Sequence, residues 1–216
     1  MRGNVALALC AVAVVCGGCR KPVSTPAEAP KPEEEKIVAE TPSTAELQPP
    51  TAEQIAAVKV ARRIEVALET DKGKIALELE GTAAPVAVAN FVNLVRGGFY
   101  DEMPFHRVEP GFVIQAGDPS LAGKGPAGYS IPDEESPLKH RRGTVAMARL
   151  YRGGRMLPDS ASTQFYICLG DAPHLDQMGF TAFGRVTEGL EVIDTIAVGD
   201  RIRRATAAVE PQAGAT

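Results

Sequence analysis

An arginine, a large aromatic ring and a side-chain amide stand close together in PFHRVEPGFVIQAGDP, the segment at residues 104–119. Arg107 lies among apolar residues, Phe112 follows a Glu-Pro-Gly turn, and Gln115 belongs to the apolar run after that turn. Because side chains alternate between the faces of a strand, the segment predicts a hairpin that carries Phe105 and Arg107 on one face. A charge in apolar company needs acceptors, so Arg107 indicates either a ligand site or an ion pair.

Three stretches of the chain resemble the signatures of one family, the cyclophilins, which are peptidyl-prolyl cis-trans isomerases. The first is F-H-R-V-x-P-G-F-x-x-Q-x-G-D at 105–118, the second is STQFYI at 162–167, and the third is LDQMGFTAFGRV at 175–186. The stretches are long, and they occur in the order and at close to the spacing of the family. The resemblance runs from about residue 64 to about residue 209.

The resemblance implies a reaction that rotates the peptide bond before a proline, over a barrier of about 18–20 kcal/mol. Twisting this bond removes the amide resonance, so the prolyl nitrogen regains a lone pair and accepts a hydrogen bond. An arginine fixed at that nitrogen stabilises the twisted state more than either planar isomer. The reaction needs no cofactor and no metal, and the three histidines and single cysteine of the domain lack metal-ligand spacing.

By the same resemblance Arg107 is the catalytic residue, and a set of apolar side chains lines the proline pocket: Phe112, Val113, Tyr166 and Leu175. Other residues hold the peptide main chain or stand at the edges of the pockets: Gln115, Ala148, Arg149, Gln164, His174 and Phe180. Tyr166 stands where Phe is common, and its hydroxyl needs a partner. Phe180 stands where many members carry His or Tyr, and His174 replaces a tryptophan that binds the inhibitor cyclosporin.

Simpler interpretations of the same residues compete with these roles. Isolated apolar residues such as Phe112 and Leu175 more often belong to a core. Arg107 alone fits a structural ion pair with Glu109 or Asp118. His106 is expected to be a packed histidine and His140 to lie in a charged loop. Six basic residues form either a solvated loop or a positive rim that favours acidic substrates: Lys139, Arg141, Arg142, Arg149, Arg152 and Arg155.

The spacing of apolar residues predicts eight short strands and two helices. The strands are expected at 64–69, 75–79, 105–108, 112–116, 144–148, 164–169, 182–186 and 205–209. The helices are expected at 84–96 and 190–197, and a further short helix within 51–63. This pattern fits a barrel or a sandwich. The resemblance selects a mainly β fold, namely a closed eight-stranded antiparallel barrel capped by two helices.

Residues 1–19 resemble an export signal, with Arg2 followed by a short run of apolar residues that ends in Cys-Gly-Gly-Cys. Cys19 is the candidate for lipidation, as in bacterial lipoproteins, and cleavage of an ordinary signal peptide is the alternative. Residues 20–63 are rich in Pro, Glu and Ala and predict a disordered tether with the short helix. The isomerase domain is then expected at 64–211, with a disordered tail at 212–216.

The net charge of −4 gives no electrostatic reason to expect nucleic-acid binding. Only Cys168 lies in the domain, so we expect no disulfide there and a buried thiol. We expect a monomeric rotamase that acts on proline-containing, unfolded or extended segments of exported proteins. The lipid anchor would place it in the periplasm, on the outer membrane because Arg20 rather than Asp follows Cys19, and without lipid it would be secreted. A non-catalytic module that binds proline peptides, or a structural envelope lipoprotein, is the alternative.

Overall fold

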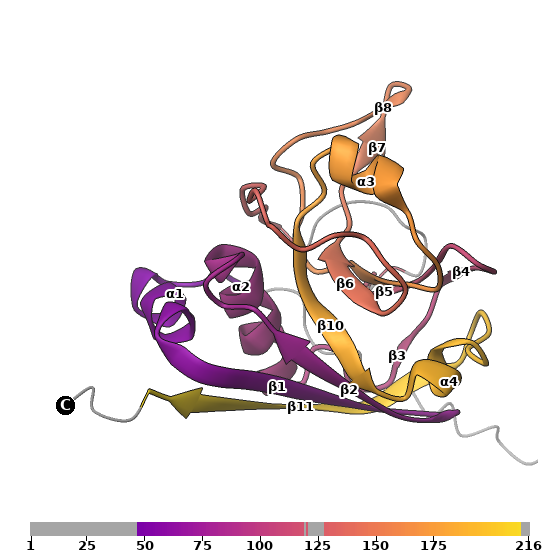
Figure 1. Cartoon of the computed structure of the whole chain (residues 1–216), viewed down its shortest axis with the longest axis horizontal. Coiled ribbons are helices and arrows are strands. Elements are labelled where there is room, and N and C mark those ends of the chain that lie inside the picture. Colours follow the sequence, from indigo (N-terminus) through magenta and orange to yellow (C-terminus); the bar gives the residue numbers. More distant parts are fainter. Residues whose placement is uncertain (1–46, 119, 121–127, 213–216) are drawn as a thin grey trace, which may run out of the picture. The chain divides into compact units, whose positions relative to one another are not determined.

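The computed structural model describes residues 47–118, 120 and 128–212 (Figure 1). The predicted export signal, Cys19, most of the tether and nearly all of the C-terminal tail lie outside these residues. In the part of the chain that the structure describes, no helix has the length and apolar character needed to cross a membrane.

Alternating apolar residues form the first hairpin of the domain. Strands β1 (Ala61–Thr70) and β2 (Gly73–Leu79) pair antiparallel, and buried side chains alternate with more exposed ones along both. The other strands of the same sheet are β3 (Met103–Pro104), β4 (Arg107–Glu109), β5 (Val113–Ala116), β6 (Thr144–Met147), β9 (Phe165–Cys168), β10 (Ala182–Glu188) and β11 (Arg201–Pro211). Each predicted strand therefore corresponds to a strand of this sheet, with one exception at 105–108.

The described residues contain four helical segments, where the sequence predicted three: α1 (Ala52–Lys59), α2 (Pro85–Arg96), α3 (Pro173–Gln177) and α4 (Leu190–Ile193). Helix α2 confirms the prediction for 84–96, and α1 confirms the short helix within 51–63. Helix α4 ends at Ile193, with Asp194 as its C-cap, and is therefore four residues shorter than the predicted helix at 190–197. Helix α3 is a single short turn that the apolar spacing does not reveal.

The sheet curls but does not close, so the predicted closed eight-stranded barrel is wrong (Figure 1). Nine strands follow the order β3-β11-β1-β2-β10-β6-β9-β5-β4. The ninth strand is β3, which precedes the predicted strand 105–108. The chain divides at Phe105 and His106, which lie in no strand, and only residues 107 and 108 of the predicted strand belong to β4. The N–H of Phe105 donates to the Asp200 carbonyl beside β11, whereas the N–H of His106 donates to the Gln115 carbonyl in β5. The chain thus passes from one edge strand directly to the other, and no ladder among the described residues joins them.

The central strands β5, β6 and β9 are buried on both faces. One face carries Ile114, Val145 and Phe165 into the main core, where Phe165 packs edge-to-face on Phe91 of α2. The opposite face carries a second cluster, called here the outer cluster: Val113, Ala146, Tyr166, Cys168, Ala172, Leu175, Phe180 and Ala182. Two apolar faces thus explain why these strands read as almost continuous apolar runs.

The division of the predicted strand also separates two side chains that were expected on one face. Phe105 is fully buried in the main core, whereas Arg107 lines a cavity on the surface. Period-two alternation holds only where the backbone is continuously extended, and Phe105 and His106 lie outside both strands.

Candidate active site

The outer cluster brings together the apolar residues predicted to line the proline pocket. Val113, Tyr166, Leu175 and Phe180 belong to the cluster, and Phe112 and Ala148 pack against it partly exposed. The Phe112 ring stacks on His174 at 5.4 Å between centroids, and Tyr166 meets Phe180 edge-on at 6.1 Å. These residues form an apolar wall that is separate from the main core, and Phe112 and Ala148 are its partly exposed members.

Arg107 lies at the start of β4 beside this wall. Its guanidinium carbon is 5.8 Å from the centre of the Phe112 ring. Its Nε and Nη2 donate to Glu109 Oε1 at 2.9 and 2.7 Å, and its Nη1 donates to Gln115 Oε1 at 3.0 Å. The ion pair proposed from the sequence therefore exists, with Glu109 rather than Asp118. A guanidinium has five N–H groups, and these three bonds to described residues leave two for a ligand.

A chain of hydrogen-bonded side chains supports Arg107 through Gln115. Gln115 Nε2 donates to Gln164 Oε1 at 2.7 Å, and Gln164 Nε2 donates to Asp118 Oδ2 at 3.2 Å. Asp118 is 1% exposed, so the chain is anchored inside the protein. The backbone places Gln115 opposite Arg107 in the β4–β5 ladder and opposite Tyr166 in the β5–β9 ladder. Strand register thus places Gln115 beside Arg107, and the side-chain bond to Gln164 adds the third predicted polar residue.

Gly117 allows the strand that carries Gln115 to approach the segment that carries Gln164. A Cβ at Gly117 would lie 2.3 Å from the Thr163 carbonyl oxygen, and its φ of +97° is unfavourable for other residues. Thr163 Oγ1 donates to the Gly117 carbonyl at 2.9 Å, and Tyr100 Oη donates to the Thr163 carbonyl at 2.8 Å. This glycine is therefore required for the close packing that fixes the amide chain.

The Tyr166 hydroxyl finds its partner in His140, which lies 2.9 Å away through Nε2. His140 Nδ1 is 2.7 Å from Asp176 Oδ1. His140 lies in a loop between Lys139 and Arg141, as predicted, but its side chain is only 2% exposed. Burial lowers the pKa of His140, and the hydrogen bond to Asp176 only partly offsets this. A neutral His140 that donates Nδ1–H to Asp176 accepts the Tyr166 O–H at Nε2. Burial of that phenol raises the pKa of Tyr166 far above its ordinary value.

The guanidinium of Arg149 bonds to groups of the protein itself. Its Nε donates to Asp133 Oδ1 at 2.8 Å, and its Nη groups donate to the carbonyls of Met178 and Gly179. The guanidinium carbon also lies 4.9 Å from the centre of the Phe180 ring. The side chain of Arg149 thus holds the loop before β10, and only its backbone is available to pair with a peptide.

A cavity of about 870 Å³ adjoins Arg107 and Gln115. Ala148, Arg149 and Gln164 also line it, so the predicted polar residues and the predicted peptide-binding segment share one space. One wall was missed from the sequence, a two-stranded hairpin of β7 (Tyr151–Arg152) and β8 (Arg155–Met156). The signal that indicates it is the Gly-Gly pair between the two strands, because this dipeptide favours two-residue hairpin turns.

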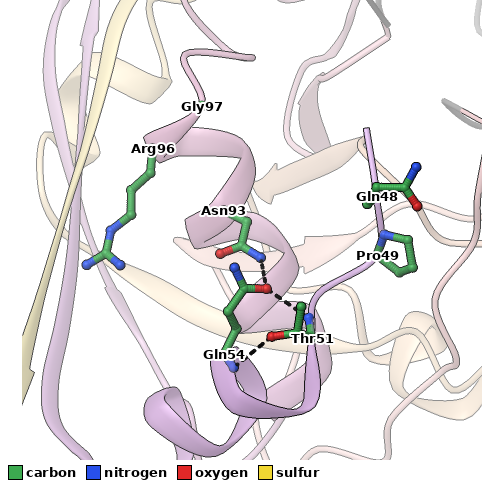
Figure 2. A pocket seen from close by; sticks show the side chains of 7 residues that line it. All are labelled: Gln48, Pro49, Thr51, Gln54, Asn93, Arg96 and Gly97. Atoms are coloured by element: carbon green, nitrogen blue, oxygen red, sulfur yellow. Dashed lines mark hydrogen bonds between the residues drawn. The ribbon is translucent and has the colours of Figure 1, made fainter. Parts of the chain in front are cut away.

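A second cavity, of about 430 Å³, lies between the start of α1 and the end of α2 (Figure 2). Thr51 and Gln54 form a capping box there, and Gln54 Oε1 also accepts a hydrogen bond from Asn93 Nδ2 at 2.7 Å. The polar side chains drawn in Figure 2 thus bond largely to one another. None of the residues predicted to bind substrate lines this cavity.

Two other ionisable groups lie near the site. Burial lowers the pKa of His106, an effect that Asp118 partly offsets, and its buried Nδ1 has no hydrogen-bond partner among the described residues. Burial raises the pKa of Cys168 to about 12, so this thiol stays protonated and unreactive. In the described ranges, no group of three or more His, Cys, Asp or Glu is placed to hold a metal ion.

This chain is similar to known proteins in both sequence and fold. A family model described as "Cyclophilin type peptidyl-prolyl cis-trans isomerase/CLD" matches residues 65–211. The peptidyl-prolyl cis-trans isomerase of Helicobacter pylori is 44% identical over 148 residues, which are 67% of this chain and 86% of that protein. Peptidyl-prolyl cis-trans isomerase B of Bacillus subtilis is 42% identical, over 60% of this chain and 87% of that protein.

A solved structure agrees with these sequence matches. The crystal structure of a cyclophilin-type peptidyl-prolyl cis-trans isomerase from Cryptosporidium parvum has a TM-score of 0.61 and 30% identity to this chain. The match covers 69% of this chain and 99% of that structure. The curled antiparallel sheet, the matching residues and the named relatives agree, and the chain belongs to the cyclophilin-type peptidyl-prolyl cis-trans isomerases.

Proposed function

We propose that Arg107 carries the isomerase reaction and that the outer cluster binds the proline ring, in a protein that serves exported polypeptides. One observation carries the assignment of the catalytic residue: the Arg107 guanidinium lies beside the apolar wall with two N–H groups left over from its bonds to Glu109 and Gln115. A donor in such surroundings suits a reaction whose transition state gains a hydrogen-bond acceptor.

Binding of the proline ring against Phe112, Leu175 and Phe180 would place the preceding amide next to Arg107. The amide twists, its nitrogen becomes pyramidal and accepts a hydrogen bond from a guanidinium N–H. The planar ground state offers no such lone pair, so the bond forms only as the barrier is crossed. The chain from Gln115 through Gln164 to Asp118 supports this step, since a donor fixed in advance needs no reorganisation.

The related Cryptosporidium parvum protein was also crystallised in the presence of the dipeptide Ala-Pro. That structure has a TM-score of 0.59 and 29% identity to this chain, and it covers 67% of the chain. A ligand of this chemistry supports the proposal that the substrate of the present protein is an extended segment with a proline at its centre.

Isomerisation kinetics on an X-Pro peptide test the assignment of Arg107. Arg107→Ala should lower kcat/KM by at least about tenfold, a loss of about 1.4 kcal/mol or more in transition-state stabilisation. Binding of the same peptide should weaken much less, because the strongest contact forms only when the amide is twisted. Arg107→Lys should recover little, since an ammonium does not reproduce the planar fork.

Phe112→Ala is the matched control, since it removes a pocket wall and leaves the guanidinium. Binding and turnover should then fall together, because the ring contacts the proline in every state. If Arg107→Ala retains the kcat/KM of the parent protein, the catalytic assignment is wrong. If Phe112→Ala impairs turnover alone, the outer cluster does not bind the proline.

The exported role rests on the sequence before the domain. A short apolar run after Arg2 precedes Cys-Gly-Gly-Cys, and a Pro- and Glu-rich stretch follows. These features support a lipoprotein signal with Cys19 as the lipidated residue and a tether that carries the isomerase away from the membrane. The substrates would then be proteins that fold after export.

A further inference from the structure

The β7–β8 hairpin forms a wall of the cavity beside Arg107. Tyr151 and Arg152 from β7 and Met156 from β8 line this cavity. The hairpin has its own two-stranded ladder, separate from the nine-stranded sheet. Met156 also packs against the outer cluster, whereas Tyr151 and Arg152 are exposed side chains of the hairpin.

Hydrogen bonds give the hairpin a defined geometry. Gly153 and Gly154 have φ values of 62° and 81°, as a two-residue type I′ turn requires. The N–H of Leu157 donates to the Leu150 carbonyl at 2.8 Å, next to the two strand pairs. The N–H of Leu150 donates to Ser160 Oγ at 3.0 Å. The base of the hairpin is thus tied to the residues that follow it.

The register of this ladder places two like charges opposite each other. Arg152 pairs with Arg155 across the strands, so their side chains leave the same face. Like charges in directly opposite positions destabilise a hairpin. Within residues 47–118, 120 and 128–212, neither guanidinium has an ion pair or a hydrogen bond. A pair that weakens its own ladder and has no partner is available for an anion.

The other charged residues that line the cavity do not provide a partner for Arg152 and Arg155. Arg107 pairs with Glu109 at 2.7 Å and Arg149 pairs with Asp133 at 2.8 Å. Arg152 is thus the lining arginine without a carboxylate among the described residues, and no described Asp or Glu lines the cavity. Of the predicted basic rim, Arg142 and Arg149 have carboxylate partners, and the uncompensated charge at the cavity belongs to the hairpin.

We propose that Arg152 and Arg155 select substrates that carry an acidic side chain within a few residues of the proline. The proposal rests on the proposed function, because it takes the cavity beside Arg107 as the place where the peptide lies. A carboxylate between the two guanidinium groups would accept charge-assisted hydrogen bonds and relieve their repulsion. Tyr151, which is 66% exposed, offers an aromatic face to the same peptide segment.

Matched peptides test this selectivity. Each pair differs only in Glu or Gln, placed two or three residues before the proline or two residues after it. The quantity measured is the ratio of kcat/KM for the Glu peptide to kcat/KM for the Gln peptide. We expect a ratio of about three to ten at one of these positions for the parent protein, falling towards one at high salt. The double variant Arg152→Gln/Arg155→Gln should give a ratio of about one.

The double variant Arg62→Gln/Arg204→Gln is the matched control, because it removes two exposed arginines that do not line the cavity. It changes the net charge equally and should retain the parent ratio. Arg152→Glu/Arg155→Glu should instead favour Lys over Gln at the same position, which excludes simple loss of structure. A parent protein that isomerises Glu and Gln peptides equally at every position overturns this inference alone. A parent protein that turns over neither peptide overturns the proposed function.

Discussion

One residue of the outer cluster, Tyr166, serves two purposes, because it belongs to the apolar wall and also ends a buried chain of hydrogen bonds. Tyr166 contributes its ring to the apolar wall, and its hydroxyl bonds to His140. His140 in turn bonds to Asp176 through its ring and through its backbone N–H at 3.0 Å. The position of the pocket wall is therefore linked to the protonation of one buried histidine.

The pKa of His140 makes the stability of the fold depend on pH. Burial lowers this pKa from its ordinary value of 6.5, so the unfolded chain takes up a proton first as the pH falls. The stability from neutral His140 is present above about pH 6.5 and is lost as the pH falls towards the folded pKa. Burial shifts the pKa of His106 in the same direction and adds to this loss.

Unfolding by urea between about pH 7.5 and about pH 5 measures this contribution. The free energy of unfolding of the parent protein should fall with the pH across this range. His140→Gln should be less stable at neutral pH by about 1–3 kcal/mol, since Asp176 and Tyr166 lose their partner. It should also depend less on pH. Tyr166→Phe keeps the titrating ring and serves as the control. A His140→Gln variant with the pH dependence of the parent would contradict this account.

At the scale of elements, hydrogen bonds from distant segments satisfy backbone groups that a helix leaves unpaired. Helix α2 has Ala84 at its N-cap position, and no side chain there bonds its first N–H groups. The carboxylate of Glu134 accepts the N–H groups of Val86 and Ala87 at 3.0 and 2.8 Å. A carboxylate at this end of a helix also interacts favourably with the helix dipole. The neighbouring Asp133 holds Arg149, so one segment joins the helix to the cavity wall.

Glu134→Gln should therefore destabilise the fold by about 1–2 kcal/mol, because the amide keeps one acceptor and no charge. The midpoint of urea unfolding should decrease while the slope stays the same. Glu135→Gln is the control, as Glu135 is exposed and has no bond to a described residue. Equal midpoints for the two variants would show that the cap contributes nothing.

The strands were predictable from the sequence because short apolar runs, as in β5, β6 and β9, and alternation, as in β1 and β2, are local properties of the chain. In the structure Val113 belongs to the outer cluster and Ile114 to the main core. The cap on α2 was not predictable in this way, because Glu134 lies 48 residues from Val86 in the chain. The division at Phe105 was missed for the same reason, since it depends on Asp200 and Gln115.

At the scale of the whole molecule, the described domain has a site but no membrane-spanning helix. An attachment through Cys19 would leave the cavity and the hairpin free to meet extended chains. Each acyl chain would add about 0.8 kcal/mol of membrane affinity for every buried methylene group. The long Pro- and Glu-rich stretch would set the distance over which the site searches.

Cys19→Ala tests the anchor in the full chain. The variant should move from the membrane fraction to the soluble exported fraction, whereas Cys10→Ala, a change inside the apolar run, should not. Mass spectrometry of the mature N-terminus should find acyl groups on the parent protein and on the Cys10→Ala variant, but not on the Cys19→Ala variant. Unchanged membrane association of the Cys19→Ala variant would leave the proposed lipidation without support.

The two open edges of the sheet are short, and prolines limit both of them. Strand β3 consists of Met103–Pro104, and β4 ends at Glu109 just before Pro110. An edge strand with unpaired N–H and C=O groups is a template for the addition of another strand, and short edges with proline resist this. An isomerase that holds unfolded chains is constantly exposed to such strands. The end strands β3 and β4 therefore offer such strands almost no ladder to extend.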